Sequence, residues 1–213
     1  MLHVIHTDDR GAPDGYASYR TKEDWKGATS HNEIRVMELM AASPSCHASL
    51  WRYLLDTDLA KTISCARGRV DESLRWLLAD PRRFSVTEMY DFLWLRLLDV
   101  AGALAARRYA AADRVVIEID SGFPSACTKR YLLNTVSEKE HGSAFPFAAE
   151  CTPSEAAPDL ALDEGTLAAT YLGGVSFATL AAAGRVRELT PGAVTRADTM
   201  FLGSTSPFCS TEF

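Results

Sequence analysis

The sequence predicts an α+β fold in two parts, and residues 91–119 carry most of that prediction. The apolar run at 93–98 is typical of a strand buried on both faces, and the Ala- and Arg-rich run at 100–109 favours a helix. A β-branched run at 115–119 then favours a second strand. Strand and helix patterns are mixed before this stretch, and a second small α+β set follows it. We therefore expect the stretch to close one domain and to open another.

In the first part of the chain, turn residues and hydrophobic periodicity separate short strands from short helices. The expected strands are 2–6 and 15–20, which form a hairpin, and then 33–39, 61–65 and 84–88. A helix begins at Ser43-Pro44, where a capping hydroxyl precedes proline. Its apolar stripe comprises Leu50, Trp51, Leu54 and Leu55. We expect Asp71 to cap a second helix that stops at Asp80-Pro81. The apolar face of that helix comprises Leu74, Leu77 and Leu78.

The second part has the same kinds of signal. The expected strands are 129–136, 144–151 and 160–162, and the expected helices are 163–170, 176–183 and 190–202. Asp163 caps the first of these helices, and Gly203 ends the last. Gly173-Gly174 is interpreted as a tight turn, with a cradle for a phosphate as the alternative. The tryptophans Trp51, Trp76 and Trp94 occupy positions typical of core packing.

Composition excludes several classes of protein as first choices. A length of 213 residues with 47% hydrophobic and 23% charged residues is typical of one large or two small globular domains. The net charge of −6 disfavours a nucleic-acid partner, which needs clustered Lys and Arg. The chain has no apolar run long enough to span a membrane and no signal-peptide pattern, so we expect a cytoplasmic protein. The strand-like residues 2–5 suggest a fragment that begins within a folded element.

Cysteine and histidine spacing predicts no metal site. The five cysteines are odd in number and lack CxxC spacing, so we interpret them as reduced thiols. The five histidines are scattered, and His3 and His6 in the first strand are interpreted as surface residues. Nucleotide-binding glycine motifs and the nucleophile elbow GxSxG are absent from the sequence.

Two features remain as candidate chemistry. Asp91 precedes the apolar run at 93–98, where a carboxylate is either a turn residue or a ligand contact. The tail ends in Glu212 and Phe213, and its apolar character suggests that it docks on a surface. If it does, Glu212 and the α-carboxylate of Phe213 arrive together. The α-carboxylate has an ordinary pKa of about 3.5, and desolvation and a neighbouring carboxylate would both raise it. The group then becomes a more useful proton acceptor for an ammonium substrate.

Several stretches together resemble the Eis (enhanced intracellular survival) type of aminoglycoside acetyltransferase, in its C-terminal half. They are GYASYR at 15–20, LWRYLLDTDLAKTI at 50–63, LRWLLADPR at 74–82, LWLRLLDVAGALAARRYA at 93–110, ATYLGGVSFATLAAAGRV at 169–186, and Glu212-Phe213. They cover nearly the whole chain in the family's order. None of them is a catalytic motif alone.

The resemblance implies an architecture. Family members resemble two successive GNAT (GCN5-related acetyltransferase) folds followed by a sterol-carrier-like α+β domain. By this resemblance, residues 1–112 are the later part of the second GNAT fold, with a mixed sheet and helices, and residues 113–213 are the sterol-carrier-like domain. The family's acetyl-CoA motif and its general-acid tyrosine belong to the first GNAT fold, and neither is recognised here. Homo-oligomers, usually hexamers, are implied as well.

The same resemblance assigns roles to the candidate residues. The α-carboxylate of Phe213 is the expected base, and Glu212 and Asp91 are the expected contacts for a polycationic amine. Phe92 stands where the family commonly has glycine after the aspartate. The implied reaction is direct attack of the amine on the acetyl-CoA thioester, as in aminoglycoside resistance. Without the acetyl-CoA-binding domain, we expect the isolated chain to be inactive.

A second hypothesis is a non-catalytic module. The sterol-carrier-like part would hold a lipid or another small apolar molecule between its sheet and helices, and the first part would be a scaffold or an oligomer contact. Apolar residues at 172–180 fit this hypothesis and fit an ordinary core equally well. Copurifying lipid would favour the second hypothesis, whereas a filled interior would favour the first.

Overall fold

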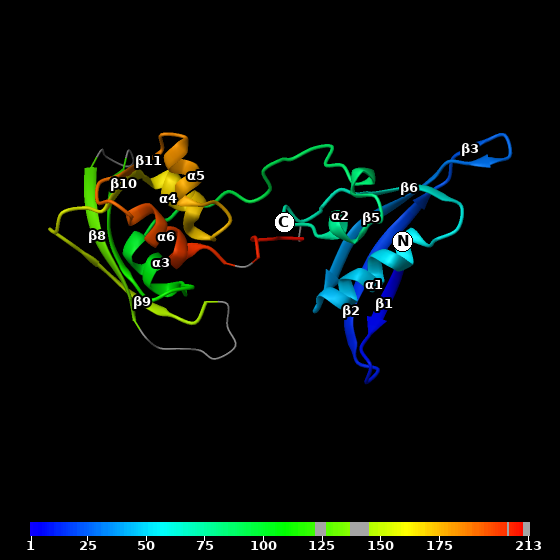
Figure 1. Ribbon diagram of the computed structural model, residues 1–213, viewed down its shortest axis with the longest axis horizontal. Helices are drawn as coiled ribbons and strands as arrows, with labels where there is room; N and C mark the ends of the chain where they lie inside the picture. The colour runs from blue at the N-terminus through cyan, green and yellow to red at the C-terminus, as the bar shows by residue number, and fades with distance from the viewer. Residues whose placement is uncertain (122–126, 137–144, 204, 211–213) are drawn as a thin grey trace. The chain divides into compact units, whose positions relative to one another are not determined.

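Figure 1 presents the computed structural model, which describes residues 1–121, 127–136, 145–203 and 205–210. Contacts divide the chain into two compact units, one formed by Met1–Tyr90 together with Ser210, and the other by Asp91–Cys209. Each unit has its own sheet and hydrophobic core, which confirms the predicted α+β class. Residues 91–112, expected to belong to the first domain, are grouped with the second unit.

The first unit is built on a four-stranded sheet. Its order is β1 (Leu2–Thr7), β2 (Pro13–Lys22), β5 (Asn32–Ala41) and β6 (Ala60–Cys65). The predicted hairpin is confirmed, since β1 pairs antiparallel with β2. A small separate hairpin joins β3 (Trp25–Lys26) to β4 (Thr29–Ser30). Strands β5 and β6 are parallel, so the chain must cross over between them, and helix α1 (Pro44–Leu55) makes that crossover.

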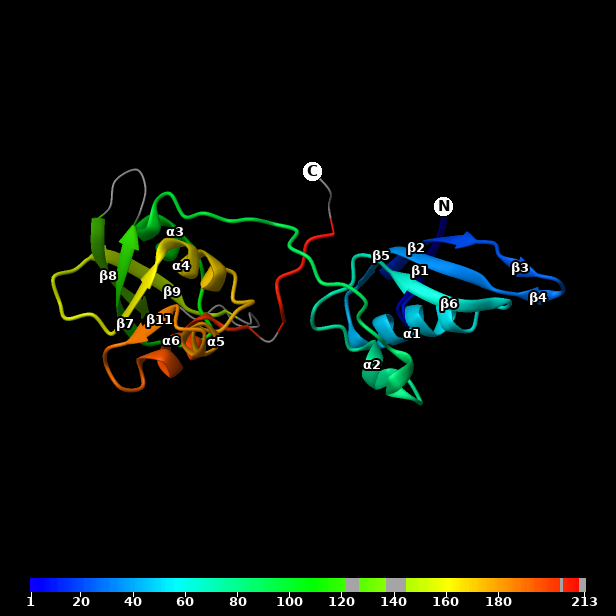
Figure 2. The same cartoon turned by 90° about the horizontal axis from the view of Figure 1, so that it is seen from above.

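Helix α1 begins where the sequence predicts. The Ser43 hydroxyl accepts a hydrogen bond from the Cys46 N–H at 3.2 Å, and Pro44 opens the first turn. The helix lies against the sheet, as Figures 1 and 2 show, and buries Leu50, Trp51 and Leu54. Leu55 is 47% exposed, so its expected place in the core was wrong.

The segment after β6 departs most from prediction. Asp71 pairs with Arg69 instead of capping, and α2 (Leu74–Leu77) is a single turn with Leu77 exposed. A 3₁₀ turn at Pro81–Arg83 follows. The strands expected at 84–88 and 93–98 do not form, and Trp94 is 83% exposed. A strand requires a neighbour for its backbone groups, and the described residues supply none here. Trp76 is also exposed, so of the three tryptophans expected in the core only Trp51 is buried.

The second unit has a five-stranded sheet. Its order is β11 (Val186–Glu188), β10 (Leu160–Asp163), β7 (Arg114–Ser121), β8 (Cys127–Val136) and β9 (Ala148–Pro153). Strand β7 confirms the β-branched run at 115–119 and lies in the centre, antiparallel to β8 and parallel to β10. Strand β11 was not predicted. It has only three residues, too few to establish a periodicity.

Four helices pack against one face of this sheet (Figure 2), namely α3 (Val100–Ala106), α4 (Glu164–Tyr171), α5 (Phe177–Ala182) and α6 (Ala193–Phe201). Asp163 caps α4 as predicted, accepting a hydrogen bond from the Thr166 N–H at 2.6 Å. Asp99 caps α3 in the same way. The core beneath the helices contains Tyr109, Phe177 and Phe201, all fully buried.

Candidate functional site

The predicted catalytic tail is described as far as Ser210. Glu212 and Phe213 lie outside the described residues. Ser210 itself is grouped with the first unit, where its carbonyl accepts a hydrogen bond from the Arg67 guanidinium at 2.9 Å. The Ser210 side chain also forms a hydrogen bond with Glu38. The segment that precedes the candidate base is therefore held on the first unit.

Asp91 is connected to the same place through its neighbour. The Tyr90 hydroxyl donates a hydrogen bond to the Ala66 carbonyl at 2.8 Å, and Ala66 is followed directly by Arg67. The turn after β6 thus holds both Ser210 and the residue before Asp91. Asp91 is exposed and non-helical, as a ligand contact requires. Of the three predicted site residues, Asp91 alone lies within the described part of the chain.

A tyrosine and a carboxylate extend this anchor onto the sheet. The Tyr16 hydroxyl on β2 donates a hydrogen bond to Glu38 Oε2 on β5 at 2.8 Å. Hydrogen bonds from Ser210 and Tyr16, together with the positive charge of Arg67, lower the pKa of Glu38. The same contact raises the pKa of Tyr16. Glu38 therefore remains an anion that can order the tail, while Tyr16 remains protonated. Sequence reasoning missed both residues, because their proximity follows from strand pairing.

The glycine pair at Gly173-Gly174 is a turn and not a phosphate cradle. Gly173 has φ +76°, and a Cβ there would lie 2.6 Å from the Phe201 carbonyl oxygen. The following helix, α5, already has an anion at its N-terminus, because Asp198 accepts hydrogen bonds from the N–H groups of Phe177 and Ala178. A phosphate would have to displace that carboxylate.

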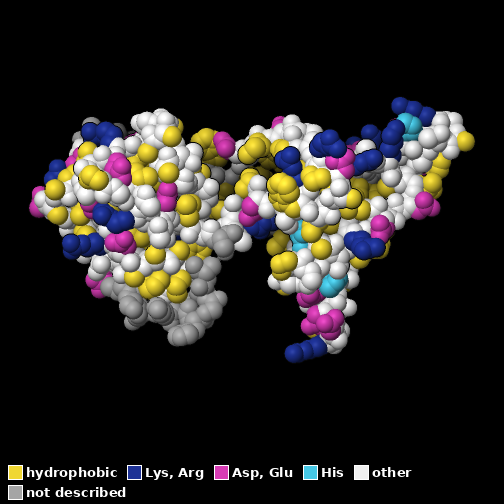
Figure 3. All heavy atoms as spheres, viewed as in Figure 1, with side chains coloured by type: hydrophobic (Ala, Val, Ile, Leu, Met, Phe, Trp, Pro, Cys, Tyr) yellow, Lys and Arg dark blue, Asp and Glu magenta, His cyan; other side chains and the backbone are white. Residues whose placement is uncertain are grey.

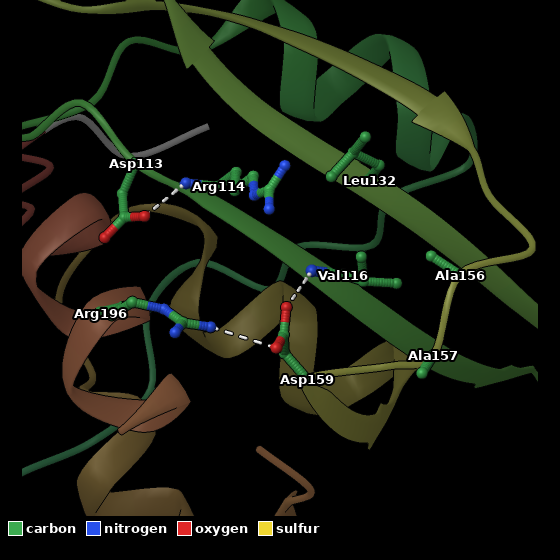
Figure 4. Close-up of a pocket in the computed structure, with 8 residues that line it drawn as sticks. All are labelled: Asp113, Arg114, Val116, Leu132, Ala156, Ala157, Asp159 and Arg196. Carbon is green, nitrogen blue, oxygen red and sulfur yellow. Dashed lines mark hydrogen bonds and ion pairs between the residues drawn. The ribbon is translucent and has the colours of Figure 1, made fainter. Parts of the chain in front are cut away.

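The second unit has an open pocket of about 380 Å³, shown in Figure 4. Two of its charged groups pair with each other: Arg196 lies 3.1 Å from Asp159, and Asp159 Oδ2 accepts a hydrogen bond from the Val116 N–H at 2.9 Å. Burial acts to raise the pKa of Asp159, but Val116, Thr190 and Arg196 outweigh it and lower that pKa. A structural ion pair therefore forms part of the pocket wall. A site for an apolar ligand would need a predominantly apolar wall.

Aromatic side chains pack together in the interior between the sheet and the helices of the second unit. Phe201 makes edge-to-face contacts with Phe177 and Tyr109 at ring-centroid distances of 5.0 and 5.1 Å. The Arg107 guanidinium lies 4.4 Å from the Phe201 ring centroid and donates hydrogen bonds to the carbonyls of Tyr171 and Phe201. These side chains occupy the region in which the module hypothesis would place a lipid.

Two surface properties bear on partners. On the face seen in Figure 3, Lys and Arg side chains are interspersed with Asp and Glu, and they form no continuous basic stripe. In the part of the chain that the structure describes, no helix combines the length and the apolar character that crossing a membrane requires.

Comparison with family models divides the chain in two. Residues 1–97 match the acetyltransferase (GNAT) domain, and residues 100–210 match the sterol carrier protein domain. The two matches meet near the division between the compact units. The mixed sheet with α1 is accordingly GNAT-like, and the helix-covered sheet of the second unit is sterol-carrier-like.

Individual relatives match across both parts. An uncharacterised N-acetyltransferase of Streptomyces avermitilis is 36% identical over 207 residues, which are 97% of this chain and 48% of that protein. The N-acetyltransferase Eis of Mycobacterium tuberculosis is 34% identical over 204 residues, 94% of this chain and 46% of that protein. The crystal structure of Eis1 from Mycobacterium abscessus superposes with a TM-score of 0.79 at 34% identity, covering 95% of this chain and 49% of that one.

These matches cover only part of each relative, which limits the properties that can be inferred for this chain. The chain spans about half the length of the curated relatives it matches. Their similarity nevertheless runs through both sheets and all but a few residues of this chain. The chain belongs to the sterol carrier protein domain family over residues 100–210, carries a GNAT acetyltransferase domain match over residues 1–97, and is homologous to the Eis-type N-acetyltransferases.

Proposed function

We propose that this chain is the C-terminal, substrate-side portion of an acetyl-CoA-dependent amine N-acetyltransferase. The α-carboxylate of Phe213 takes the proton from the attacking amine, and Glu212 and Asp91 attract a polycationic acceptor of the aminoglycoside type. A preceding GNAT domain supplies the acetyl-CoA site, and the isolated chain does not turn over. The assembled protein is a homo-oligomer, with the hexamer of the resemblance as the first expectation.

The anchoring of Ser210 carries this proposal. Three residues follow Ser210 in the sequence, and an extended chain advances about 3.3–3.6 Å per residue, so a tail of this length can reach about 10 Å from the Ser210 anchor. Glu212 lies closer still along the chain. Asp91 follows Tyr90, which bonds to the same turn as Ser210. Ser210 and Tyr90 are thus both bonded to the turn after β6.

Electrostatics support the choice of an amine as acceptor. Two adjacent carboxylates and Asp91 attract a polycation and disfavour an anionic substrate. Placing them in a closed active site would raise the pKa of the terminal carboxylate from its ordinary value of about 3.5. The proton then moves from the ammonium to the Phe213 carboxylate, and the amine nitrogen attacks the thioester carbonyl. The C–S bond breaks as the amide forms, and the leaving CoA thiolate takes up the second proton from the nitrogen.

The decisive experiment restores the other half. The chain is assayed for acetyl-CoA turnover with an aminoglycoside acceptor, first alone and then fused behind the preceding half of the Streptomyces avermitilis relative. We expect no turnover from the chain alone and turnover from the fusion. Turnover by the chain alone, or none by a folded fusion that binds acetyl-CoA, would contradict the proposal.

Tail variants of the fusion test the residue roles. One glycine added after Phe213 moves the α-carboxylate and should lower kcat by at least about 100-fold, because small misplacements of a reacting group are costly. Glu212→Gln keeps the α-carboxylate and should mainly raise KM. Asp91→Asn should act in the same way, with Asp80→Asn as the matched control, since Asp80 is a carboxylate of the first unit that pairs with Arg82. Equal kcat in the extended and native tails would overturn the role of Phe213.

The anchor can be tested separately. Arg67→Gln removes the charged donor to the Ser210 carbonyl, so we expect lower kcat with unchanged acetyl-CoA affinity in the fusion. Arg82→Gln, on an exposed side chain, is the control. An unchanged kcat for Arg67→Gln would show that the tail is positioned by other contacts.

The module hypothesis makes a different prediction. A lipid or small-molecule module would release a bound apolar compound on denaturation, detectable by mass spectrometry. The aromatic residues that fill the second unit oppose this outcome. A stoichiometric compound from the purified chain would favour the module over the enzyme part.

A further inference from the structure

Three metal-ligand side chains from separate elements converge in the first unit. They are His6 on β1, Asp14 on β2 and Cys46 in the first turn of α1. One ring nitrogen of His6, one carboxylate oxygen of Asp14 and Cys46 Sγ all lie within 4.8 Å of one another. Sequence spacing did not reveal this cluster, because strand pairing and helix packing bring the residues together.

A β-bulge aims two of these side chains at each other. His6 pairs with Gly15 and Thr7 pairs with Pro13, so Asp14 is an extra residue on β2. In a regular strand, Asp14 and Gly15 would point to opposite faces of the sheet. The bulge turns Asp14 toward His6, and His6 Nδ1 lies 2.5 Å from Asp14 Oδ1.

Gly15 makes room for the third side chain. A Cβ at Gly15 would lie 2.3 Å from Cys46 Sγ, so only glycine allows the helix to place its thiol against the bulge. Cys46 is fully buried, and its Sγ lies 3.5 Å from the Asp14 carbonyl oxygen. Burial and the nearby Asp14 raise the pKa of the Cys46 thiol, so a metal ion has to displace the thiol proton when it binds.

We propose that His6, Asp14 and Cys46 form a binding site for a zinc-class divalent cation. An imidazole, a carboxylate and a thiolate are the three donor types that zinc accepts, and three protein ligands leave a fourth position for water or an added ligand. The thiolate and the carboxylate balance the charge of a divalent ion. None of these residues belongs to the proposed acetyl-transfer chemistry, so the site stands independently of it.

The geometry requires a small adjustment. Zinc–ligand bonds of about 2.0–2.3 Å in a tetrahedron place ligand atoms roughly 3.3–3.8 Å apart. Cys46 Sγ lies within 4.8 Å of the other two atoms, whereas His6 and Asp14 are closer together than the tetrahedron requires. These two side chains are 26% and 22% exposed, so they can separate by about 1 Å and leave an entry path from solvent.

The test is metal binding to the full chain after treatment with a chelator. Co²⁺ is added first, because a cobalt–thiolate bond gives a near-ultraviolet charge-transfer absorption, and Zn²⁺ affinity is then measured by competition. We expect one equivalent per chain. Cys46→Ser should abolish the cobalt–thiolate band, and His6→Asn and Asp14→Asn should each weaken Zn²⁺ binding by at least about tenfold.

Matched controls keep the outcome specific. His3→Asn removes a histidine from the same strand, and Cys127→Ser removes an exposed thiol; both should bind as the native chain does. Because Cys46 is a core residue, circular dichroism checks the fold of its variant, and the two partly exposed ligands carry the same test. No binding by the native chain, or a cobalt–thiolate band that survives Cys46→Ser, would overturn the proposal.

Discussion

The two units differ in where they place polar groups. In the second unit, aromatic rings pack against one another between the sheet and the helices, and the partly buried Arg107 donates hydrogen bonds to the C-terminal carbonyls of α4 and α6. In the first unit, polar side chains lie along the sheet and its helix, as in the Tyr16–Glu38 contact and the His6–Asp14 pair. Both units bury apolar side chains between a sheet and helices, but they place their polar side chains differently.

This difference indicates that the second unit is a packed scaffold, whereas the first unit offers a polar surface suited to chemistry. An interior packed with aromatic rings leaves little freedom for ligands, whereas partly exposed charged groups can bind a ligand, order a segment or exchange a proton. We therefore expect substitutions in the second unit to change mainly its stability, and polar substitutions in the first unit to change binding or turnover. Amide hydrogen exchange of peptides from each unit can measure the two stabilities separately.

The largest expected effect is from Phe201→Ala. Phe201 is fully buried and contacts two other rings, so its removal leaves a cavity and should lower the free energy of unfolding of the second unit by about 3–5 kcal/mol. Hydrogen exchange in β7 should accelerate accordingly. Leu98→Ala, at a residue that is 92% exposed in the same unit, should change the value by about 0.5 kcal/mol or less. Equal effects would contradict the packing described above.

Gly15→Ala should have the next largest effect, in the first unit. The added Cβ would meet Cys46 Sγ at 2.3 Å and the Met40 carbonyl oxygen at 2.8 Å, so we expect a loss of about 1–3 kcal/mol. Gly68→Ala meets nothing within 4 Å and should stabilise the unit slightly, by about 1 kcal/mol at most. If Gly15→Ala is tolerated as well as Gly68→Ala, the close approach of helix and bulge is wrong.

Asp159 should give the second unit an acid-sensitive component of stability. Its folded-state pKa is lowered, so the unfolded chain takes up the proton first as the pH falls. The stabilisation is complete above the ordinary carboxyl pKa and is lost as the pH falls through the lowered value. Asp159→Asn should cost about 1 kcal/mol at neutral pH and flatten this dependence in a urea titration series. If the free energy of unfolding of Asp159→Asn falls with acid as steeply as that of the native chain, Asp159 does not cause the acid-sensitive component.

The smallest stability effect is expected from Tyr16→Phe. The hydrogen bond to Glu38 is partly exposed, so the first unit should lose about 1 kcal/mol or less. In the fusion enzyme, however, the loss of this contact should lower kcat through the Ser210 anchor. A large loss of stability with normal kcat would contradict this expectation. It would mean that the polar contacts of the first unit serve its stability and not turnover.

The strand predictions show what a local pattern can and cannot specify. The runs at 93–98 and 115–119 are both strongly apolar, yet only the second forms a strand. Strand β7 has β8 and β10 as hydrogen-bonding neighbours, whereas the described residues give 93–98 none. Helix caps were easier to predict, although Asp71 was wrong, because Ser43 and Asp163 act on N–H groups a few residues away.

The candidate site divides in the same way. Asp91 and the tail were found from the sequence pattern, and the resemblance assigned their roles, whereas the contacts of Arg67, Glu38 and Tyr16 became visible only in the folded structure. The His6–Asp14–Cys46 cluster depends on a bulge between β1 and β2. The sequence at 13–15 did not predict that bulge. Interactions between distant residues were therefore the part that sequence reasoning could not supply.

The strand order of the second unit has a consequence for the timing of folding. Strand β7 is central, but its parallel neighbour β10 follows only after β8 and β9, as in the pairing of Ile117 with Leu160. Closing such long loops is slow, so this sheet should form later than the local β1–β2 hairpin. During synthesis, the sheet and helix of the first unit can form before β10 emerges. Ser210 comes after all of these elements, so its bond to Arg67 closes on a unit that is already folded.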